Sequence, residues 1–521
     1  MRRELTKYLR LPTMSRMETG AVLSRRPAVV GGLLLILMLL TGLGWAVSSP
    51  VESSPDDNYH LGSIWCPRPA GESCQTSVVD GDPVVRVPIA VADESMRCYV
   101  LQSNKSAGCA LGYDDSHMVW SKRFDNGAYP IGYYHFHHLL VGKDVQTSVL
   151  VMRGVNVLIA VTLLGTIGFC APRQLRRPFI GAIVASWVPM GVYFIASNNP
   201  SSWAVSGLMA YSAATFMAPQ QNGRRRIALV ICAVIGAVMC LTSRYDAAFF
   251  LLVVGLALLF AVPWKRGGWI GLSALAGVAL LGFGTFMASS QVSKVAYFLR
   301  VFEASDPAKS ADKQPFFEKL LVGLETAPKY LGGFWGHTWT PGWHDVPLGA
   351  RAPYVLTIMA AGAFVAVGLR RGGWRKWTAL AIIVGSMVLL PALFYANGAM
   401  DTIELYQARY IFPLLAPTFF LMLAVDQDEG AWFTVPQAVW VTVFISLCQT
   451  ITLHTLLLRF VQGAQERWEL DLNKHIEWWW SAPVSPMMVW FFTTCFATAA
   501  LGTAIAMLTR TAEKHEATQH S

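Results

Sequence analysis

A series of about twelve apolar stretches limits this chain to the folds available to membrane proteins. Each stretch is close to the ~20 residues that a helix needs to cross the hydrocarbon core of a bilayer. Only 14% of the 521 residues are charged, against about 25% in an ordinary soluble domain. We therefore predict an all-α polytopic membrane protein with small elements in its outer loops. The predicted spans are 28–48, 149–170, 178–197, 203–220, 227–243, 247–263, 269–288, 350–370, 377–396, 410–425, 433–457 and 486–508.

Basic residues in the short loops set the direction of these spans. They precede the first span and follow the second, fourth, sixth and eighth, as the positive-inside rule expects of cytoplasmic loops. Both termini are then cytoplasmic, with an N-terminal segment 1–27, a membrane domain 28–508 and a tail 509–521. The acidic loop 426–429 is a mild exception. The first span has about 20 apolar residues and more spans follow it, which favours an uncleaved anchor over a signal peptide.

Three long loops, 49–148, 289–349 and 458–485, then lie outside a bacterial plasma membrane. The first of them contains four cysteines, which in an oxidising compartment favour two disulfides with three possible pairings. A zinc site is the alternative, but no C-x₂₋₄-C pair supports it. These cysteines are Cys66, Cys74, Cys98 and Cys109.

Two adjacent carboxylates, Asp56 and Asp57, follow the first span directly, with His60 close behind. Acidic groups are costly next to hydrocarbon. One of them could take a proton from an attacking hydroxyl, or the pair could bind a divalent cation such as Mg²⁺ or Mn²⁺. The plain alternative is a solvated turn at the start of the loop.

Two arginines are expected at the same membrane face. Arg409, flanked by Gln407 and Tyr410, opens the tenth span, and Arg244 lies in a short turn before Asp246. A guanidinium at head-group level suits a phosphate or pyrophosphate. Arg409 could instead extend to lipid phosphates, and Arg244 could simply form a local ion pair.

The second outer loop ends in a segment rich in glycine, tryptophan and histidine, 332–348, which contains Trp343, His344 and Asp345. Aromatic residues at this level are often interface anchors. Tryptophan faces also suit sugar rings and isoprenoid chains. Both interpretations stay open from the sequence.

Three motifs in this order resemble one family of uncharacterised bacterial membrane proteins, common in actinobacteria and grouped with the GT-C membrane glycosyltransferases. They are Pro-Asp-Asp-x-x-His at 55–60, the aromatic loop ending in Trp-x-Asp-Val-Pro-Leu at 343–348, and Gln-x-Arg-Tyr-x-x-Pro at 407–413. The resemblance covers roughly residues 28–460. Asp57 stands where the family usually has Glu, and Ala408 where it usually has Gly.

This resemblance implies a GT-C-like fold of about twelve spans and a lipid-linked donor. A sugar on a polyprenyl phosphate would be transferred at the outer face to an envelope glycan or lipid acceptor. Asp56 or Asp57, beside His60, would match the acidic centre, and Arg409 the phosphate clamp. Many GT-C enzymes work without metal, so a cation is not required.

Two other functions stay open. A transporter or flippase of a lipid-linked glycan would use similar residues, but it should also place ionisable groups deep within its spans, where this sequence has few. A non-catalytic envelope-assembly protein would not need the carboxylates. Membrane lipids are expected partners in every case. Nucleic acid is not, because no basic nucleic-acid-binding motif accompanies the net charge of +9.

Overall fold

The fold is known from a computed structural model, which describes residues 27–92, 98–187, 189–264, 268–289, 315–336, 339–348, 352–398, 400, 402–403, 406–425, 432–464 and 469–509. Residues 1–26 of the predicted N-terminal segment 1–27, residues 510–521 of the predicted tail 509–521 and the acidic loop 426–429 lie outside the described residues.

Each of the twelve predicted spans contains a helix, so the apolar stretches were correctly identified as helical. The helices of the bundle are α2 (Pro27–Ala46), α7 (Val145–Cys170), α8 (Arg173–Ser186), α9 (Pro189–Ile195), α10 (Ser201–Met217), α11 (Gly223–Ser243), α12 (Tyr245–Ala261), α13 (Trp269–Met287), α17 (Ala352–Gly368), α18 (Trp374–Ala396), α19 (Leu415–Ala424), α20 (Val435–Val461) and α21 (Pro486–Thr509).

Within the described residues, seven of these helices are long and apolar enough to cross a membrane, namely α2, α7, α11, α13, α18, α20 and α21. Helices α8 and α9 add an eighth candidate if they are counted as one span, although their axes differ by 92°. Helices such as α12 and α17 have 17 residues each. At 1.5 Å per residue they are about 25 Å long, shorter than a typical ~30 Å hydrocarbon core.

Small residues allow some of these helices to touch along their backbones. A Cβ added at Gly236 of α11 would lie 2.5 Å from the carbonyl oxygen of Gly207 in α10. Glycine is therefore required at this crossing, as at many contacts between membrane helices.

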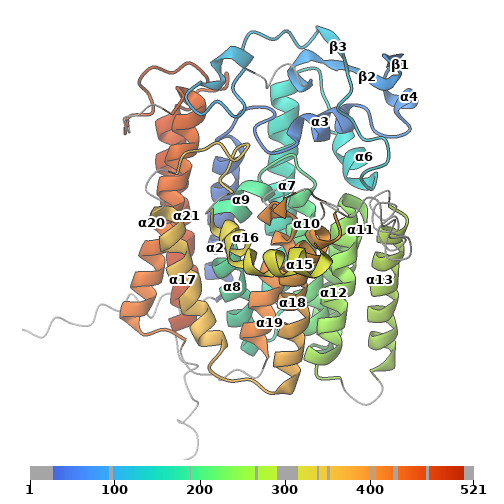
Figure 1. The fold of residues 1–521 in the computed structure, drawn as a ribbon. Coiled ribbons are helices and arrows are strands. Elements are labelled where there is room, and N and C mark those ends of the chain that lie inside the picture. Colours follow the sequence, from blue (N-terminus) through green and yellow to red (C-terminus); the bar gives the residue numbers. More distant parts are fainter. Residues whose placement is uncertain are drawn as a thin grey trace, which may run out of the picture.

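The first long loop folds as a layer over one end of the bundle (Figure 1). It contains α3 (Asp57–Trp65), α4 (Ala70–Ser73), α6 (Gly132–His138), two short 3₁₀ turns at Ile89–Val91 and Ala107–Ala110, and an antiparallel sheet. The sheet has the order β1 (Thr76–Val79), β2 (Asp82–Pro88), β3 (Met118–Ser121), with Val85 opposite Thr76 on one side and Ser121 on the other. We call this end of the bundle the loop end.

The second long loop also contributes short helices. Helices α15 (Phe316–Glu325) and α16 (Ala327–Gly332) lie across the bundle rather than along it (Figure 1), and α15 packs on α18. Further 3₁₀ turns occur at Ala218–Gln220, Gly333–Trp335, Ala408–Tyr410 and Phe412–Leu414.

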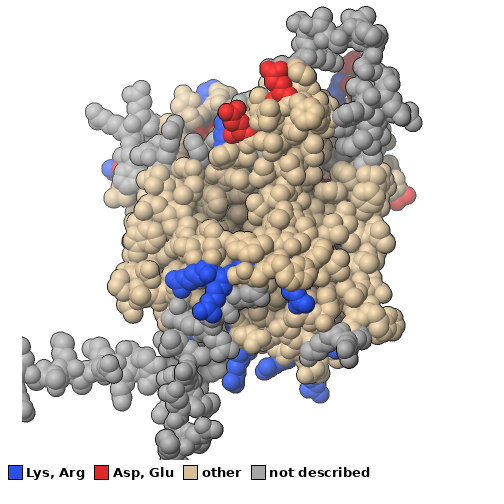
Figure 2. Space-filling view, turned by 60° about the horizontal axis from the view of Figure 1, so that its bottom comes forward, with Lys and Arg blue, Asp and Glu red and all other residues tan. Residues whose placement is uncertain are grey.

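Charged side chains divide between the two ends of the molecule. In Figure 2 most of the visible lysine and arginine side chains lie on its lower part, and the visible acidic ones lie mainly on the upper part. We call the end that carries Arg173, Arg176 and Arg225, opposite the loop end, the arginine end.

Candidate functional site

The two adjacent carboxylates that follow α2 have different surroundings. Asp56 is the residue before the first turn of α3 and adopts a left-handed conformation, with φ 63°. This conformation is uncommon for a residue other than glycine and is worth attention at a functional site. The Asp57 side chain is fully buried, whereas that of Asp56 is 34% exposed. The sequence left open which of the two carboxylates faces a substrate. The difference in exposure favours Asp56.

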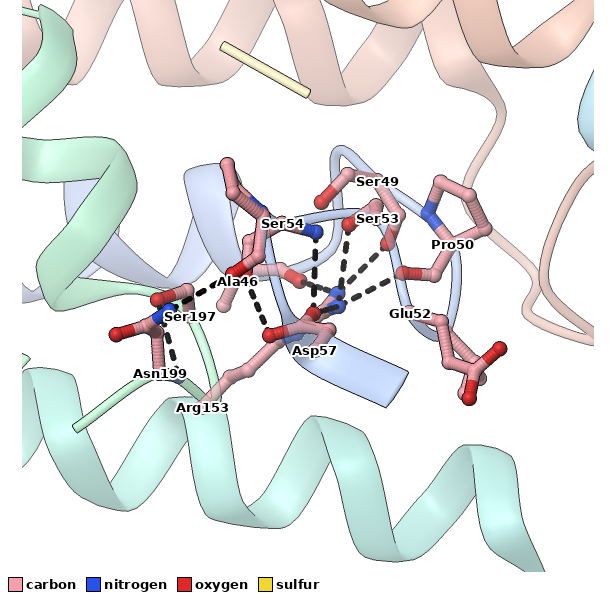
Figure 3. A network of polar contacts seen from close by, with 12 residues as sticks. Ala46, Ser49, Pro50, Glu52, Ser53, Ser54, Asp57, Arg153, Ser197 and Asn199 are labelled. Atoms are coloured by element: carbon pink, nitrogen blue, oxygen red, sulfur yellow. Dashed lines mark hydrogen bonds and ion pairs between the residues drawn. The ribbon is translucent and has the colours of Figure 1, made fainter. Parts of the chain in front are cut away.

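Asp57 belongs to a buried polar network (Figure 3). Its carboxylate accepts hydrogen bonds from the backbone N–H of Ser54, at 3.1 Å, and from the Ser54 hydroxyl, and it lies 3.8 Å from Arg153 of α7. Arg153 also donates to the carbonyl oxygens of Ser49, at 2.6 Å, and Pro50, at 2.7 Å. This network fastens the segment after α2 to α7, so Asp57 holds the loop in place.

Asp56 instead forms an ion pair with Arg409, which comes from the 3₁₀ turn before α19. Arg409 is nearly buried and also donates to the carbonyl oxygen of Pro55, at 3.1 Å. Arg123 approaches the other carboxylate oxygen at 3.7 Å. Burial alone would raise the pKa of Asp56, but Arg409, His60 and Arg123 outweigh it, so the pKa lies below its ordinary value. Asp56 is therefore ionised at neutral pH.

His60 lies one turn further along α3 and is fully buried. Its Nδ1 is 3.0 Å from the hydroxyl of Tyr134, and its Nε2 has no hydrogen-bond partner among the residues that the structure describes. Burial, together with Arg244, Arg409 and Arg123, lowers the pKa of His60 to about 3. The imidazole is therefore neutral at physiological pH.

Arg244 and Tyr410 complete this centre. Arg244 forms two hydrogen bonds with Asp246, at 2.8 and 2.6 Å, so the local ion pair considered from the sequence is present. Its guanidinium lies over the rings of Tyr129 and Tyr410, 5.7 Å from each centroid. Arg409 lies over the same Tyr410 ring, at 5.1 Å. The Tyr410 ring therefore contacts two cations and stabilises both.

Gln407 and His344 support Arg409 from the other side. The side-chain oxygen of Gln407 accepts a hydrogen bond from Nε of Arg409 and lies 3.3 Å from Nε2 of His344. Nδ1 of His344 contacts the carbonyl oxygen of Thr340, at 3.0 Å. Burial and Arg409 lower the pKa of His344.

Trp343 and Asp345, which flank His344, contact other parts of the molecule. Trp343 donates to the carbonyl oxygen of Glu52, at 2.8 Å. Asp345 pairs with Arg459 at the end of α20, at 2.7 Å, and accepts from the backbone N–H of Leu101, at 3.1 Å. These contacts join the first and second long loops to α20. The aromatic segment 332–348 therefore connects the two loops.

Four residues of this region were not predicted from the sequence, namely Arg123, Tyr129, Tyr134 and Arg153. Arg153 was identifiable as a charge inside an apolar stretch, which usually signals a specific partner. The other three carry no local signal, because only the folding of the loop layer brings them to α3.

A divalent cation fits this centre poorly. The near neighbours of the Asp56 carboxylate are arginines, whereas Mg²⁺ and Mn²⁺ need several oxygen ligands. Across the described parts of the chain there is no group of three or more His, Cys, Asp or Glu residues that could hold a metal ion.

The four loop cysteines form the two expected disulfides, Cys66–Cys74 and Cys98–Cys109. The first ties the end of α3 to α4, and the second closes the segment that packs against Arg459 through Tyr99 and Lys105. Both therefore stabilise the layer that carries Asp56.

The fold and site define a helical membrane protein with an arginine-rich polar centre at one end of its bundle. The chain belongs to the family described as predicted membrane protein (DUF2142), whose match spans residues 39–418 and so includes both Asp56 and Arg409. Searches of curated proteins and of solved structures found no match to the chain.

Proposed function

We propose that this protein is a membrane glycosyltransferase. It would move a sugar from a polyprenyl-phosphate donor to an envelope glycan or lipid acceptor. The observation that carries the proposal is the direct pairing of a partly exposed carboxylate, Asp56, with a buried arginine, Arg409, from a loop more than 350 residues away. This pair combines a base with a phosphate ligand.

The chemistry requires one bond to form and one to break. The acceptor hydroxyl oxygen attacks the anomeric carbon of the sugar, and the bond from that carbon to the donor phosphate oxygen breaks. Asp56 takes the hydroxyl proton, for which its lowered pKa keeps it in the ionised form. Polyprenyl phosphate leaves with the electron pair, and Arg409 and Arg123 offset its charge.

The Asp56–Arg409 ion pair also means that donor binding must rearrange the site. A phosphate that binds Arg409 competes with Asp56 for the same guanidinium. Once Arg409 has released the Asp56 carboxylate, that carboxylate can take the proton of the acceptor hydroxyl. At neutral pH His60 is uncharged, so Arg409 and Arg123 are the cations that act on Asp56 there.

The proposal includes a topology of twelve spans in a bacterial plasma membrane. The loop end would face outward and both termini would be cytoplasmic. The short helices α10, α12, α17 and α19 and the bent α8–α9 pair would complete the seven longer spans. The disulfides at the loop end and the basic side chains at the other end support this direction.

The test uses cells that lack the gene and express either the native protein or one variant. Asp56→Asn should abolish one envelope linkage, with a loss of activity of at least about 100-fold for removal of a catalytic base. Glycan composition and linkage analysis is the measurement, after membrane levels of the variants are matched. Asp80→Asn is the matched control, because Asp80 is an 86% exposed carboxylate of the same loop.

Three outcomes decide between the functions. Loss of a linkage with Asp56→Asn but not with Asp80→Asn supports glycosyl transfer. Full restoration by Asp56→Asn contradicts it and favours a non-catalytic assembly role. Accumulation of an unflipped lipid-linked glycan on the cytoplasmic face would contradict it in favour of a flippase.

A further inference from the structure

An apolar cavity lies away from Asp56, between helices of the bundle that the structure describes. Its volume is about 220 Å³, and it is bordered by α2, α7, α8, α9, α20 and α21. Its walls are almost entirely apolar, with Leu35, Leu164 and Ile183 among the lining residues. One polar side chain, that of Arg176, lies at its arginine end.

The cavity has the length of one lipid chain in one leaflet. Arg176 marks its mouth, and Trp187 lines it eleven residues further along the chain, just after α8 ends. At 1.5 Å per residue this is about 16 Å, close to half of a ~30 Å hydrocarbon core. Trp187 and Gln449 both line the cavity, and Nε1 of Trp187 and the side-chain oxygen of Gln449 lack hydrogen-bond partners within the described parts of the chain.

Positive charge gathers at the mouth of the cavity. Among the described residues, Arg176 donates two long hydrogen bonds, both of 3.3 Å, to the carbonyl oxygens of Ala171 and Phe169. Arg173 and Arg225 are near enough to act on Arg176 electrostatically. From residue 145 to residue 244 the sequence contains no Asp or Glu. In the described structure none of these three arginines has a carboxylate within ion-pair distance.

Two further features at the mouth favour an anion. Helix α8, of 14 residues, begins at Arg173, so its positive dipole end faces the same place. Gln221 donates to the carbonyl oxygen of Cys170, at 2.9 Å, which brings the arginines at the start of α11 beside it. Basic pockets between membrane helices on the cytoplasmic side are suited to anionic lipid head groups.

We infer that this cavity binds one anionic phospholipid of the leaflet at the arginine end. One acyl chain would fill the space between α2, α7 and α8. The phosphate would accept hydrogen bonds from Arg176, with Arg173 and Arg225 nearby. This site is separate from the proposed donor site, because the two lie toward opposite ends of the bundle, and it does not depend on the proposed function.

The experiment measures lipid binding to delipidated full-length protein in a neutral detergent by native mass spectrometry. The probes are phosphatidylglycerol and phosphatidylcholine with identical acyl chains. The native protein should bind the anionic lipid at least about tenfold more tightly, because both lipids offer a phosphate to Arg176 but only phosphatidylcholine also carries a choline cation, which the neighbouring arginines repel. Equal affinities for the two lipids would overturn the inference.

Two variants with matched controls separate the head-group contact from the chain contact. Arg176→Gln should remove the preference for phosphatidylglycerol, whereas Arg375→Gln, at an exposed arginine elsewhere at the same end, should keep it. Gly168→Leu should block both lipids, because Gly168 lines the cavity and a Cβ there meets only Phe179, at 3.6 Å. Gly502→Leu adds the same side chain outside the cavity, where a Cβ meets nothing within 4 Å.

Unchanged binding by Gly168→Leu would overturn the inference, as would a preference that survives Arg176→Gln. Size-exclusion chromatography and circular dichroism establish that each variant is folded. If one of these two variants does not fold, the other variant still tests the inference, as does the comparison of the two lipids on the native protein.

Discussion

At the scale of single residues, the two carboxylates of the acidic motif, Asp56 and Asp57, have different partners although they are adjacent in the sequence. The left-handed conformation of Asp56 lets adjacent side chains reach different partners. Asp57 meets Arg153 in a fully buried network, while Asp56 meets Arg409 at the partly exposed centre. Asp56 is therefore the better candidate for a base, and Asp57 the better candidate for a structural anchor.

His60 gives a prediction at the same scale, from its pKa of about 3. An unfolded chain binds a proton at a histidine below about pH 6.5, whereas folded His60 stays neutral until far lower pH. The unfolded state then holds more protons, so the stability that His60 contributes falls as pH drops from about 6.5 toward 3.

The measurement is the melting temperature of the native protein and of His60→Asn at pH 7.5 and pH 5.5. The melting temperature of the native protein should fall further between pH 7.5 and pH 5.5 than that of His60→Asn. An identical loss in both proteins would show that His60 is protonated in the folded state, or that another group dominates.

At the scale of elements, buried ion pairs join loops to helices. Arg153 connects the segment after α2 to α7, and Arg459 connects both long loops to α20. Each arginine is almost completely buried, donates to several carbonyl oxygens and forms an ion pair with a carboxylate. Such buried ion pairs fix the position of the loops more than they stabilise the fold. The reason is that the cost of removing two charges from water offsets much of the free energy gained by pairing them.

The Arg153 network gives the prediction at this scale. Removing one partner by Asp57→Ala leaves a buried charge unpaired, so the free energy of unfolding should fall by about 3–5 kcal/mol. Asp57→Ala with Arg153→Met should recover part of this loss, since no unpaired charge remains. Thermal unfolding in detergent measures both, and a double variant less stable than Asp57→Ala would contradict the argument.

At the scale of the whole molecule, polarity is sorted along the bundle. The disulfide-bonded loop layer and the Asp56 centre lie at the loop end, and most of the visible basic residues in Figure 2 lie toward the arginine end. A bilayer enforces this arrangement, because charged loops stay in water and basic loops favour the cytoplasmic side. The proposed donor and phospholipid sites would then face opposite leaflets.

Cysteine labelling tests this direction. Ser77→Cys, in the exposed strand β1, should react with a membrane-impermeant maleimide in intact cells. Arg225→Cys, at the exposed start of α11, should react only after the membrane is opened. Mass-spectrometric detection of the labelled residue is the readout, and the reverse pattern would invert the proposed topology.

The sequence by itself determined the positions of the helices and the use of the loop cysteines in disulfides. These properties are local: apolar runs follow from the thickness of a bilayer, and both loop disulfides join cysteines only 8 and 11 positions apart. The number of candidate spans was harder to predict, because a short or bent apolar helix has the same composition as a full span.

Only the tertiary structure decided which acid meets which arginine. Asp56 and Arg409 are 353 positions apart, and Asp345 and Arg459 are 114 apart. No local pattern encodes such pairs, since they depend on how the loops are folded over the bundle. The same holds for Arg123, Tyr129 and Tyr134, and for the apolar cavity, which exists only where six helices leave a space between them.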